Sequence, residues 1–397
     1  MSSGAAAASN IPDGLVERLG RWVARQSFVA GDGSIGPVSI SGVSRPPAGQ
    51  SNDTILFTVE WVRHGRTEHT DLVLRRQATG AAIFAEPDVL REARVLNGLA
   101  STPVPVPRIV WTESDPSVLD APFFVMERVQ GVVPLGKPSI HSVGVLPTLS
   151  QPQLRRLWDS AMDALVAVHA VDWRVNHSFL ASGDLADPAQ QLNALLEFYR
   201  WTADGRPYPI TDAAVAKLTA DVAGLSPREP VLVWGDARVG NMIFDADQHV
   251  AAVIDWELAT IGPPELDLAR WIFFDNFGTS AAGIERLPGW PSLDETLAIY
   301  QERSGRTLHD LGFYELMDEL FMATTLIRQS DLYVSRGFAG PECTMGHANT
   351  ATQMLARRLG LDVPELSPDY IAHRTPGAAK AIHMPAPKPS PAIEQTN

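Results

Sequence analysis

Residues 231–257 read VLVWGDARVGNMIFDADQHVAAVIDWE and contain three short apolar runs separated by polar turns. Apolar runs of this length between turn residues are typical of short strands. Asp236 follows the first run, Asn241 stands five positions later at the start of the second, and Asp255 ends the third. The stretch therefore predicts a small β unit whose turns carry two acids and an amide.

The spacing of Asp236, Asn241 and Asp255 suits phosphoryl transfer. In that chemistry one carboxylate accepts the proton of an attacking hydroxyl, while an amide oxygen and a second carboxylate hold the magnesium that bridges the nucleotide phosphates. An Asp and an Asn five positions apart are expected about once by chance in a chain of ordinary composition. The alternative is a β-hairpin in which both residues only shape turns. The flanking apolar runs and the later Asp favour the site.

Two charged residues in the N-terminal part of the chain favour the same interpretation. Arg75 ends the run DLVLR, where a cation on a strand could contact phosphates. Glu92 shares a helical face with the apolar residues at i+3, i+4 and i+7, which are Val95, Leu96 and Leu99. Because an inward-facing carboxylate is costly unless a cation pairs with it, we expect Glu92 to pair with Arg75. The alternative is an acid at the edge of the apolar stripe that reaches water.

Two further segments could contact a nucleotide. The segment PPAGQSNDT at 46–54 is a polar turn between strand-like runs and could present backbone N–H groups to phosphate. It could equally be a plain turn with one glycine. The segment FVMERV at 124–129 could cross between two lobes and face an adenine ring with its backbone. An ordinary edge strand explains that pattern equally well.

Composition and charge exclude several classes of protein. The chain has 397 residues, which allows two or three domains at roughly 150 residues each. Its net charge of −14 argues against a general affinity for nucleic acid, and no apolar stretch approaches the ~18 residues of a membrane span. With Cys343 as the one cysteine, neither an intramolecular disulfide nor a Cys-based zinc site is possible. We expect a cytoplasmic protein, a monomer or homodimer, whose partner is a small molecule rather than nucleic acid or membrane.

The character of the sequence changes near residue 130. Up to that point short β-prone runs surround one helical segment, and beyond it helical periodicity dominates. We expect an N-terminal helical extension at 1–30, a nucleotide-binding lobe at 31–130, a helical lobe with the substrate site at 131–372 and a flexible tail at 373–397.

The segments that carry these residues resemble the aminoglycoside phosphotransferase family, relatives of choline kinases with a protein-kinase-like fold. The resemblance is closest to the branch associated with acyl-CoA dehydrogenases. It rests on segments that follow one order between about 49 and 262: AGQSNDT, DLVLRR, REARVLNGL, VPVPRI, FFVMERVQG, WGDARVGNMIF and VIDWELATIG. It implies an α+β, bilobal protein-kinase-like fold, in which a small β-rich N-lobe contains one key helix and the larger C-lobe is mainly helical.

The resemblance also implies a role for each matching position. Asp236 would be the catalytic base, and Asn241 and Asp255 would be the magnesium ligands. Arg75 would take the place of the family's nucleotide-binding lysine, with Glu92 as its helix partner. The other nucleotide-binding positions would be Ser51 and Asn52 in the loop over the phosphates, and Met126, Glu127 and Arg128 in the adenine-binding hinge.

Three more positions carry expectations. The family's usual His before Gly-Asp is Trp234 here, so we expect the hydrogen bonds that this His makes to neighbouring backbone to be lost. Asp267, in PPELDLARW, is expected to tether the catalytic loop from a helix, as the family's equivalent does. His169 ends an apolar helical face and is expected to be a hydrogen-bonded core histidine.

The favoured function is an ATP- and magnesium-dependent kinase that phosphorylates the hydroxyl group of a small molecule. The acyl-CoA-dehydrogenase-associated branch points to a hydroxyacyl or other metabolic hydroxyl compound rather than to an antibiotic. A cationic aminoglycoside would need acids, for which Asp275 and Asp331 are candidates. The alternative is a nucleotide-binding pseudokinase, a regulatory module in which Trp234 reflects lost turnover.

Overall fold

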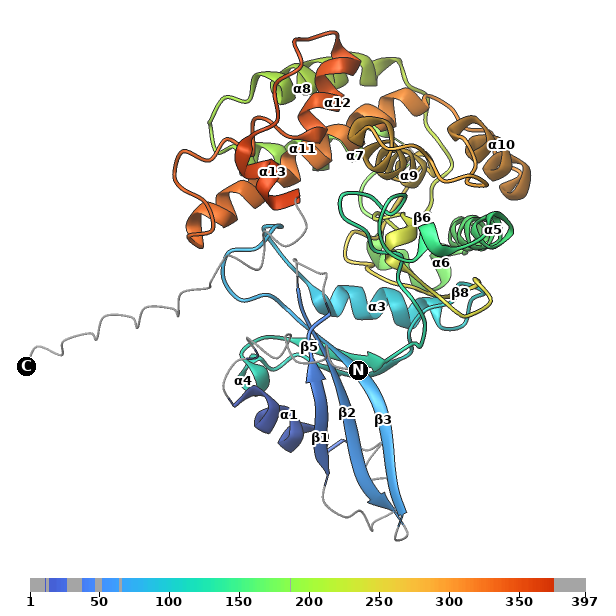
Figure 1. Cartoon of the computed structure of the whole chain (residues 1–397), viewed down its shortest axis with the longest axis vertical. Coiled ribbons are helices and arrows are strands. Elements are labelled where there is room, and N and C mark those ends of the chain that lie inside the picture. The colour runs from blue at the N-terminus through green and yellow to red at the C-terminus, as the bar shows by residue number, and fades with distance from the viewer. Residues whose placement is uncertain are drawn as a thin grey trace, which may run out of the picture.

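The computed structural model describes residues 11, 14–26, 38–46, 52–63, 66–185 and 187–374. The chain forms a sheet-rich N-terminal half and a helical C-terminal half, which meet along one side (Figure 1). The predicted α+β, two-lobed fold class is confirmed.

The N-terminal half is built on a five-stranded antiparallel sheet with the strand order β1-β2-β3-β5-β4. Its strands are β1 (Ser39–Ser44), β2 (Asp53–Arg63), β3 (Arg66–Arg76), β4 (Ile109–Glu113) and β5 (Phe123–Glu127). Every second residue of β2 is buried, from Ile55 through Phe57 and Val59 to Trp61, because successive side chains of a strand point to opposite faces.

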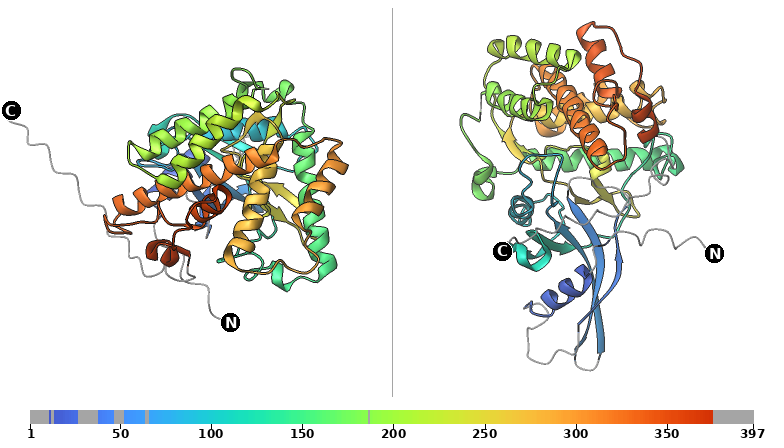
Figure 2. Two further views of the ribbon diagram at one scale, coloured as in Figure 1. Left: turned by 90° about the horizontal axis from the view of Figure 1, so that it is seen from above. Right: turned by 90° about the vertical axis from the view of Figure 1, so that its left-hand side faces the viewer.

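Helices cover both faces of this sheet (Figure 2). Helix α1 (Leu15–Val23) lies on one face, where its buried side chains share an apolar cluster with β2, β3 and β5, while the short α4 (Pro116–Leu119) packs beside it. The expected N-terminal extension at 1–30 is therefore part of the sheet-rich half wherever it is described. Helix α3 (Val89–Leu99) lies on the other face, between the sheet and the C-terminal half.

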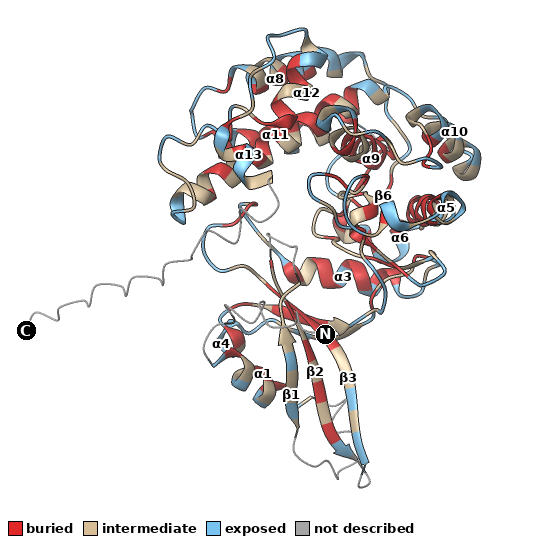
Figure 3. Ribbon diagram, viewed as in Figure 1, coloured by how far each residue is buried: buried red, intermediate tan, exposed pale blue. Residues whose placement is uncertain are grey.

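The C-terminal half is organised around one long central helix, α11, which contacts α7, α8, α9 and α12. Buried residues gather where these helices meet (Figure 3). No helix within the described ranges combines the length and apolar character needed to cross a bilayer. The helices are α5 (Gln151–His169), α6 (Trp173–Asn176), α7 (Pro188–Ala203), α8 (Pro209–Asp221), α9 (Glu265–Gly278), α10 (Leu293–Ser304), α11 (Leu311–Ser335), α12 (Thr350–Leu359) and α13 (Pro368–Arg374).

The C-terminal boundary differs slightly from the expectation. Helix α13 continues through Arg374, because the His373 ring bonds to the Tyr333 hydroxyl at 2.8 Å and the Arg374 guanidinium lies 4.4 Å from the centre of the Phe277 ring. His373 and Arg374, which the sequence analysis places in the tail, thus belong to α13, and 375–397 lie outside the described residues.

The β unit predicted at 231–257 is present as two small sheets. Strand β6 (Val231–Val233) pairs with β9 (Thr260–Gly262), and β7 (Met242–Phe244) forms a hairpin with β8 (Val250–Val253). The hairpin also contacts the segment that follows β5, because the Val132 N–H donates to the Phe244 carbonyl at 2.8 Å. A side chain at Gly131 would place its Cβ 2.4 Å from that carbonyl oxygen, so the close approach requires glycine.

Candidate functional site

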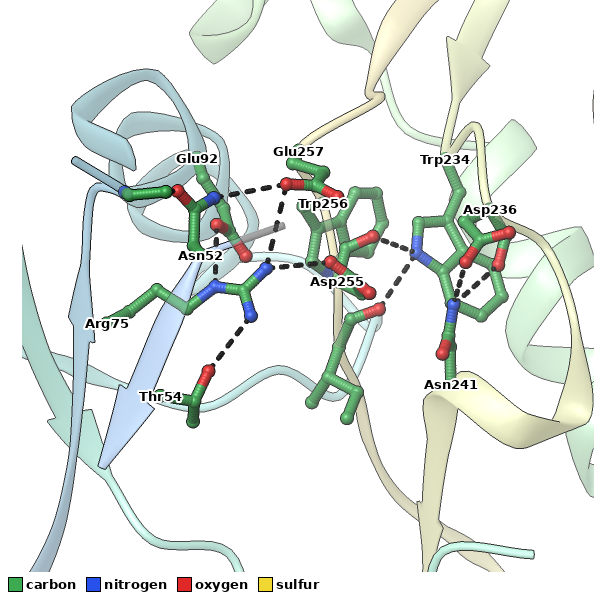
Figure 4. Close-up of polar contacts among 12 residues, drawn as sticks. Asn52, Thr54, Arg75, Glu92, Trp234, Asp236, Asn241, Asp255, Trp256 and Glu257 are labelled. Carbon is green, nitrogen blue, oxygen red and sulfur yellow. Dashed lines mark hydrogen bonds and ion pairs between the residues drawn. The ribbon is translucent and has the colours of Figure 1, made fainter. Parts of the chain in front are cut away.

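Asp236, Asn241 and Asp255 come together where the two small sheets end (Figure 4). The Asn241 side-chain amide donates to the Asp236 carboxylate at 2.5 Å and to the Asp236 carbonyl at 3.1 Å. The Asn241 carbonyl accepts the Ile254 N–H at 3.0 Å, which brings the residue before Asp255 alongside. Asn241, at the start of the hairpin, thus lies against Asp236, and Asp255 follows the residue whose backbone bonds to Asn241.

Helix α9 holds the start of the 234–241 loop in place through two hydrogen bonds. The fully buried Asp267 accepts the Trp234 and Gly235 N–H groups, each at 2.7 Å, so the predicted tether is confirmed. His169 orients Asp267, with Nε2 at 3.0 Å from its carboxylate and Nδ1 at 2.7 Å from the Tyr300 hydroxyl. The prediction that His169 is a hydrogen-bonded core histidine is confirmed as well.

Backbone geometry also constrains the loop. Gly235 has φ 90°, and a Cβ there would lie 2.4 Å from the Leu258 carbonyl oxygen, so the turn before Asp236 requires glycine. Asp255 has φ 64°, a left-handed conformation that is uncommon for a residue with a side chain. Such conformations occur at functional sites, and in this chain also at turns and helix ends, as at Asp204 and Gln248.

The expectation for Trp234 is wrong. Its indole N–H donates to the Ile254 carbonyl at 3.0 Å and to the Asp255 carbonyl at 3.2 Å. The larger ring reaches across to the strand end and supplies a donor, so the link between the 234–241 loop and Asp255 is made rather than lost (Figure 4).

Arg75 connects the two halves of the molecule. Its Nε donates to Glu92 at 3.1 Å, so the pair predicted from the helical spacing is confirmed. Its Nη1 donates to the Thr54 hydroxyl at 3.1 Å, and its Nη2 donates to Asp255 Oδ1 at 2.8 Å. Burial alone would lower the pKa of Arg75, but Glu92, Asp255 and Glu257 outweigh burial and raise it.

Asp236 is surrounded by donors that keep it ionised. Arg238 Nε donates to Oδ2 at 3.1 Å, and Arg270 Nη1 donates to Oδ1 at 3.0 Å. Burial alone would raise the pKa of Asp236, but Arg238 and Arg270 outweigh burial and hold the pKa below its ordinary value. The carboxylate is therefore anionic at neutral pH and able to accept a proton.

Sequence reasoning missed these two arginines. Arg238 stands two residues after Asp236 on the same loop, and that nearness was a usable signal. Arg270 lies three residues after Asp267, so both face the loop from one side of α9, at i and i+3. The tether and the contact to Asp236 thus come from one helical face.

The expected nucleotide-binding positions divide into two groups. Asn52 lies beside the Arg75 cluster, where its amide donates to Glu257 at 3.1 Å and accepts the Ala78 N–H at 3.2 Å. Ser51 lies outside the described residues. The hinge positions lie apart from the polar network, and the edge-strand alternative is wrong, since β5 has β3 on one side and β4 on the other.

The hinge backbone is partly occupied. The Glu127 N–H donates to the Arg108 carbonyl at 3.0 Å, and the Arg128 N–H donates to the Asp71 carbonyl at 3.1 Å. The Glu127 carboxylate forms an exposed ion pair with Arg108. Contact with an adenine ring at this position would therefore fall to Met126 and to the carbonyl groups.

The residues at the site fit a magnesium ion. Within the described ranges no group of three or more His, Cys, Asp or Glu side chains could hold a metal, so the candidate set is the mixed pair Asn241 and Asp255. Asn241 uses its N–H toward Asp236, which leaves its amide oxygen to accept. Asp255 uses Oδ1 toward Arg75, which leaves Oδ2. Magnesium commonly takes only one or two protein carboxylate or amide oxygens alongside substrate phosphates.

Comparisons with known proteins identify the family. A family model described as the phosphotransferase enzyme family matches residues 42–304. Acyl-CoA dehydrogenase family member 10 of Mus musculus is 30% identical over 226 residues, which cover 56% of this chain and 19% of that protein. The chain thus spans about a fifth of that relative's length. The resemblance expected from the motifs is confirmed.

Solved structures show the same fold. A Ralstonia eutropha protein provisionally named an aminoglycoside phosphotransferase superposes with a TM-score of 0.58 at 25% identity, covering 86% of this chain and 95% of that one. A thermostable mutant of aminoglycoside phosphotransferase APH(4)-Ia, in ternary complex with ADP and hygromycin B, superposes with a TM-score of 0.52 at 17% identity, covering 81% and 94%.

Proposed function

The chain belongs to the phosphotransferase enzyme family, and from this membership we propose that it transfers the γ-phosphate of ATP to the hydroxyl group of a small molecule, with magnesium as the metal. The observation that carries the proposal is the setting of Asp236. It is a half-buried carboxylate kept ionised by Arg238 and Arg270 and hydrogen-bonded to Asn241, one strand pair away from Asp255.

Asp236 would act as the base. The oxygen of the acceptor hydroxyl forms a bond to the γ-phosphorus, its proton passes to the Asp236 carboxylate, and the bond between the γ-phosphorus and the bridging oxygen breaks, so that ADP leaves. Arg238 and Arg270 orient the carboxylate. The hydrogen bond from the Trp234 N–H to Asp267 fixes the position of the loop relative to α9. The side chain of Asp236 keeps a small exposed fraction, 16%, through which a hydroxyl can approach.

The nucleotide side of the site would be formed by the N-terminal half. Asn241 and Asp255 would hold a magnesium ion, which would supply positive charge to offset that of the nucleotide phosphates. Arg75 would contact the phosphates, and Glu92 fixes the direction of its guanidinium. Asn52 would lie beside the phosphates, and Met126 would face the adenine ring. That two solved relatives' complexes hold ADP or AMP-PNP supports a nucleotide at this position.

The acceptor we propose is a metabolic hydroxyl compound, such as a hydroxyacyl group, rather than an aminoglycoside. The two acids offered for a cationic acceptor are already paired: Asp275 with Arg286, and Asp331 with Arg206 at 2.7 Å. The name of the mouse relative places that protein among acyl-CoA dehydrogenases, which supports a metabolic setting.

A nucleotide-binding module without turnover is the less favoured candidate. The reason for considering it was the expected loss of hydrogen bonds at position 234. Because the Trp234 indole makes bonds to the carbonyls of Ile254 and Asp255, that reason is weakened.

The test is phosphate transfer from ATP, in the presence of magnesium, to a panel of hydroxyl compounds. Asp236→Asn keeps the shape of the side chain but removes the base, so kcat should fall by about 10²–10⁴-fold. Nucleotide affinity, measured by calorimetry, should change by less than about threefold, because the residue contacts the acceptor rather than ATP. The matched control is Asp247→Asn, an exposed acid on the β7–β8 turn. Equal turnover in the two variants would disprove the role of Asp236.

A further inference from the structure

A cavity of about 220 Å³ lies beside the 234–241 loop, among α7, α9 and α11. Its walls are mostly apolar, with Leu195 and Phe198 from α7, Leu266 from α9, and Met317 and Phe321 from α11. Pockets for whole drug-sized ligands usually span roughly 300–1,000 Å³. This cavity is therefore sized for a part of a molecule that is small and mainly apolar.

The cavity adjoins the proposed base. Gly235, the residue before Asp236, lines it, and so does Arg270. The Arg270 guanidinium donates to Asp236 Oδ1 at 3.0 Å and to Asp318 Oδ1 at 2.6 Å. The Arg270 side chain thus forms part of the cavity wall and also bonds to the carboxylate that would accept the hydroxyl proton.

Asp318 supplies a carboxylate to this wall and is incompletely satisfied. Its side chain is only 7% exposed, and its Oδ2 has no hydrogen-bond partner among the described residues. Buried polar atoms in folded proteins nearly always have a partner. A hydroxyl or amide N–H on a bound molecule would supply one after a small rotation of the side chain.

A side chain of the N-terminal half packs against two residues that line the cavity. The Phe84 ring, in the segment between β3 and α3, lies 5.7 Å from the Phe198 ring and 6.4 Å from the Phe321 ring, measured between centroids. The same segment is held on α11, where Arg328 donates to the Ala82 carbonyl at 2.8 Å. The half that would carry ATP therefore also contacts the wall of the cavity.

We propose that this cavity binds the apolar body of the phosphate acceptor, that Asp318 accepts a hydrogen bond from a second polar group on it, and that Phe84 closes the wall. This inference rests on the proposed function and names the substrate class. The acceptor is a small hydroxyl compound with a mainly apolar body and a further hydrogen-bond donor close to the reacting hydroxyl.

The first experiment blocks the cavity from an exposed position. Ala194 lines it, and Asn193, the preceding exposed residue of α7, does not. The probes are straight-chain 1,2-diols from butanediol to decanediol, with binding followed by ligand-observed NMR and phosphate transfer assayed separately. Affinity for 1,2-octanediol should fall by about tenfold in Ala194→Trp, as expected for lost apolar contacts, while ATP affinity stays constant. Asn193→Trp should match the wild type. Unchanged diol binding in Ala194→Trp would overturn the inference.

A second variant tests Asp318 separately from folding. Asp318→Asn should abolish the preference for 1,2-octanediol over 1-octanol, because the amide can no longer accept as a carboxylate does. A purely structural role would weaken the binding of both ligands equally, and that result would remove Asp318 from the proposal.

The NMR readout also keeps the pocket proposal and the kinase proposal distinct. Diol binding that is sensitive to Ala194→Trp but unaccompanied by phosphate transfer supports the pocket and contradicts the kinase function. Phosphate transfer to a diol, together with unchanged diol binding in Ala194→Trp, supports the kinase function and contradicts the pocket.

Discussion

The two charged clusters at the site differ in their balance: acids outnumber cations around Arg75, whereas they are equal in number around Asp236. In the first cluster Glu92 and Asp255 bond to one guanidinium at 3.1 and 2.8 Å, and Glu257 lies 3.9 Å away. This cluster carries excess negative charge, which a divalent cation would neutralise. It lies at the junction of the two halves, where the proposed magnesium site is.

Around Asp236 the charges cancel. Asp236 and Asp318 face the guanidinium groups of Arg238 and Arg270. A balanced cluster needs no added cation, and it keeps the base ionised while fixing its direction. Under the proposed function, similar residue types would serve a metal in one cluster and a proton in the other.

The largest effect should follow from breaking the first cluster. Arg75→Leu leaves Glu92, only 3% exposed, as a buried charge without its cation, so the free energy of unfolding should fall by about 3–5 kcal/mol. Urea unfolding of the protein without nucleotide measures this. The double variant Arg75→Leu/Glu92→Leu should recover much of the loss, and Arg206→Leu, at a more exposed pair, serves as control. A double variant as unstable as Arg75→Leu would contradict this account of the pair.

The second prediction concerns the Asp236 cluster and pH. Burial, opposed by Arg270, raises the pKa of Asp318 from 3.8 to about 6. The folded protein therefore binds more protons than the unfolded chain in this window, so Asp318 contributes stability below pH 4 that is lost as the pH rises to 6. The loss is about 3 kcal/mol.

The measurement is the difference in unfolding free energy between the wild type and Asp318→Asn at several pH values from 4 to 7. The charged groups that face Asp318 are Arg270, Asp236 and Asp267. Asp236 has a lowered pKa, so its own contribution is lost only as the pH falls below 3.8 and stays constant in this window. A difference that does not vary with pH would exclude the raised pKa of Asp318.

The third prediction tests the link between the clusters. Trp234→Phe removes the indole donor and leaves the carbonyls of Ile254 and Asp255 short of a partner, at a cost of about 1–3 kcal/mol. Urea unfolding gives the stability, and the magnesium concentration at half-maximal activity reports whether Asp255 has moved. Trp201→Phe, at an exposed tryptophan, should leave both values close to those of the wild type.

The smallest effect belongs to an exposed pair. Asp331→Asn breaks the ion pair with Arg206, whose side chain is 45% exposed, and should change the unfolding free energy by less than about 1 kcal/mol. Turnover and acceptor KM should stay within twofold, because Asp331 belongs to neither charged cluster. A large rise in acceptor KM would instead restore Asp331 as a contact for a cationic acceptor.

The sequence was most informative where spacing along the chain determines geometry. The helical period placed Glu92 on the inner face of α3, and β3 then brought Arg75 to it. The strand ends at Asp236 and Asp255 were visible as breaks between apolar runs. Such features depend on local periodicity, which the sequence carries directly.

What could not be predicted depends on side-chain reach across the fold. Arg270 contacts Asp236 from a helix 34 residues later, and Asp318 joins it from α11. The reach of the Trp234 indole to the Asp255 carbonyl depends on how far apart two loops lie, and residue type alone does not give that distance. The cavity likewise could not be predicted from the sequence, because it forms where α7, α9 and α11 meet.

The indole at position 234 has one more consequence. An imidazole gains a proton near pH 6.5 and changes its donors as it does so, whereas an indole N–H keeps its hydrogen at every pH at which the protein folds. The hydrogen bonds from the Trp234 indole to the Ile254 and Asp255 carbonyls therefore do not depend on pH. The link between the 234–241 loop and Asp255 should therefore hold at acidic pH as it does at neutral pH.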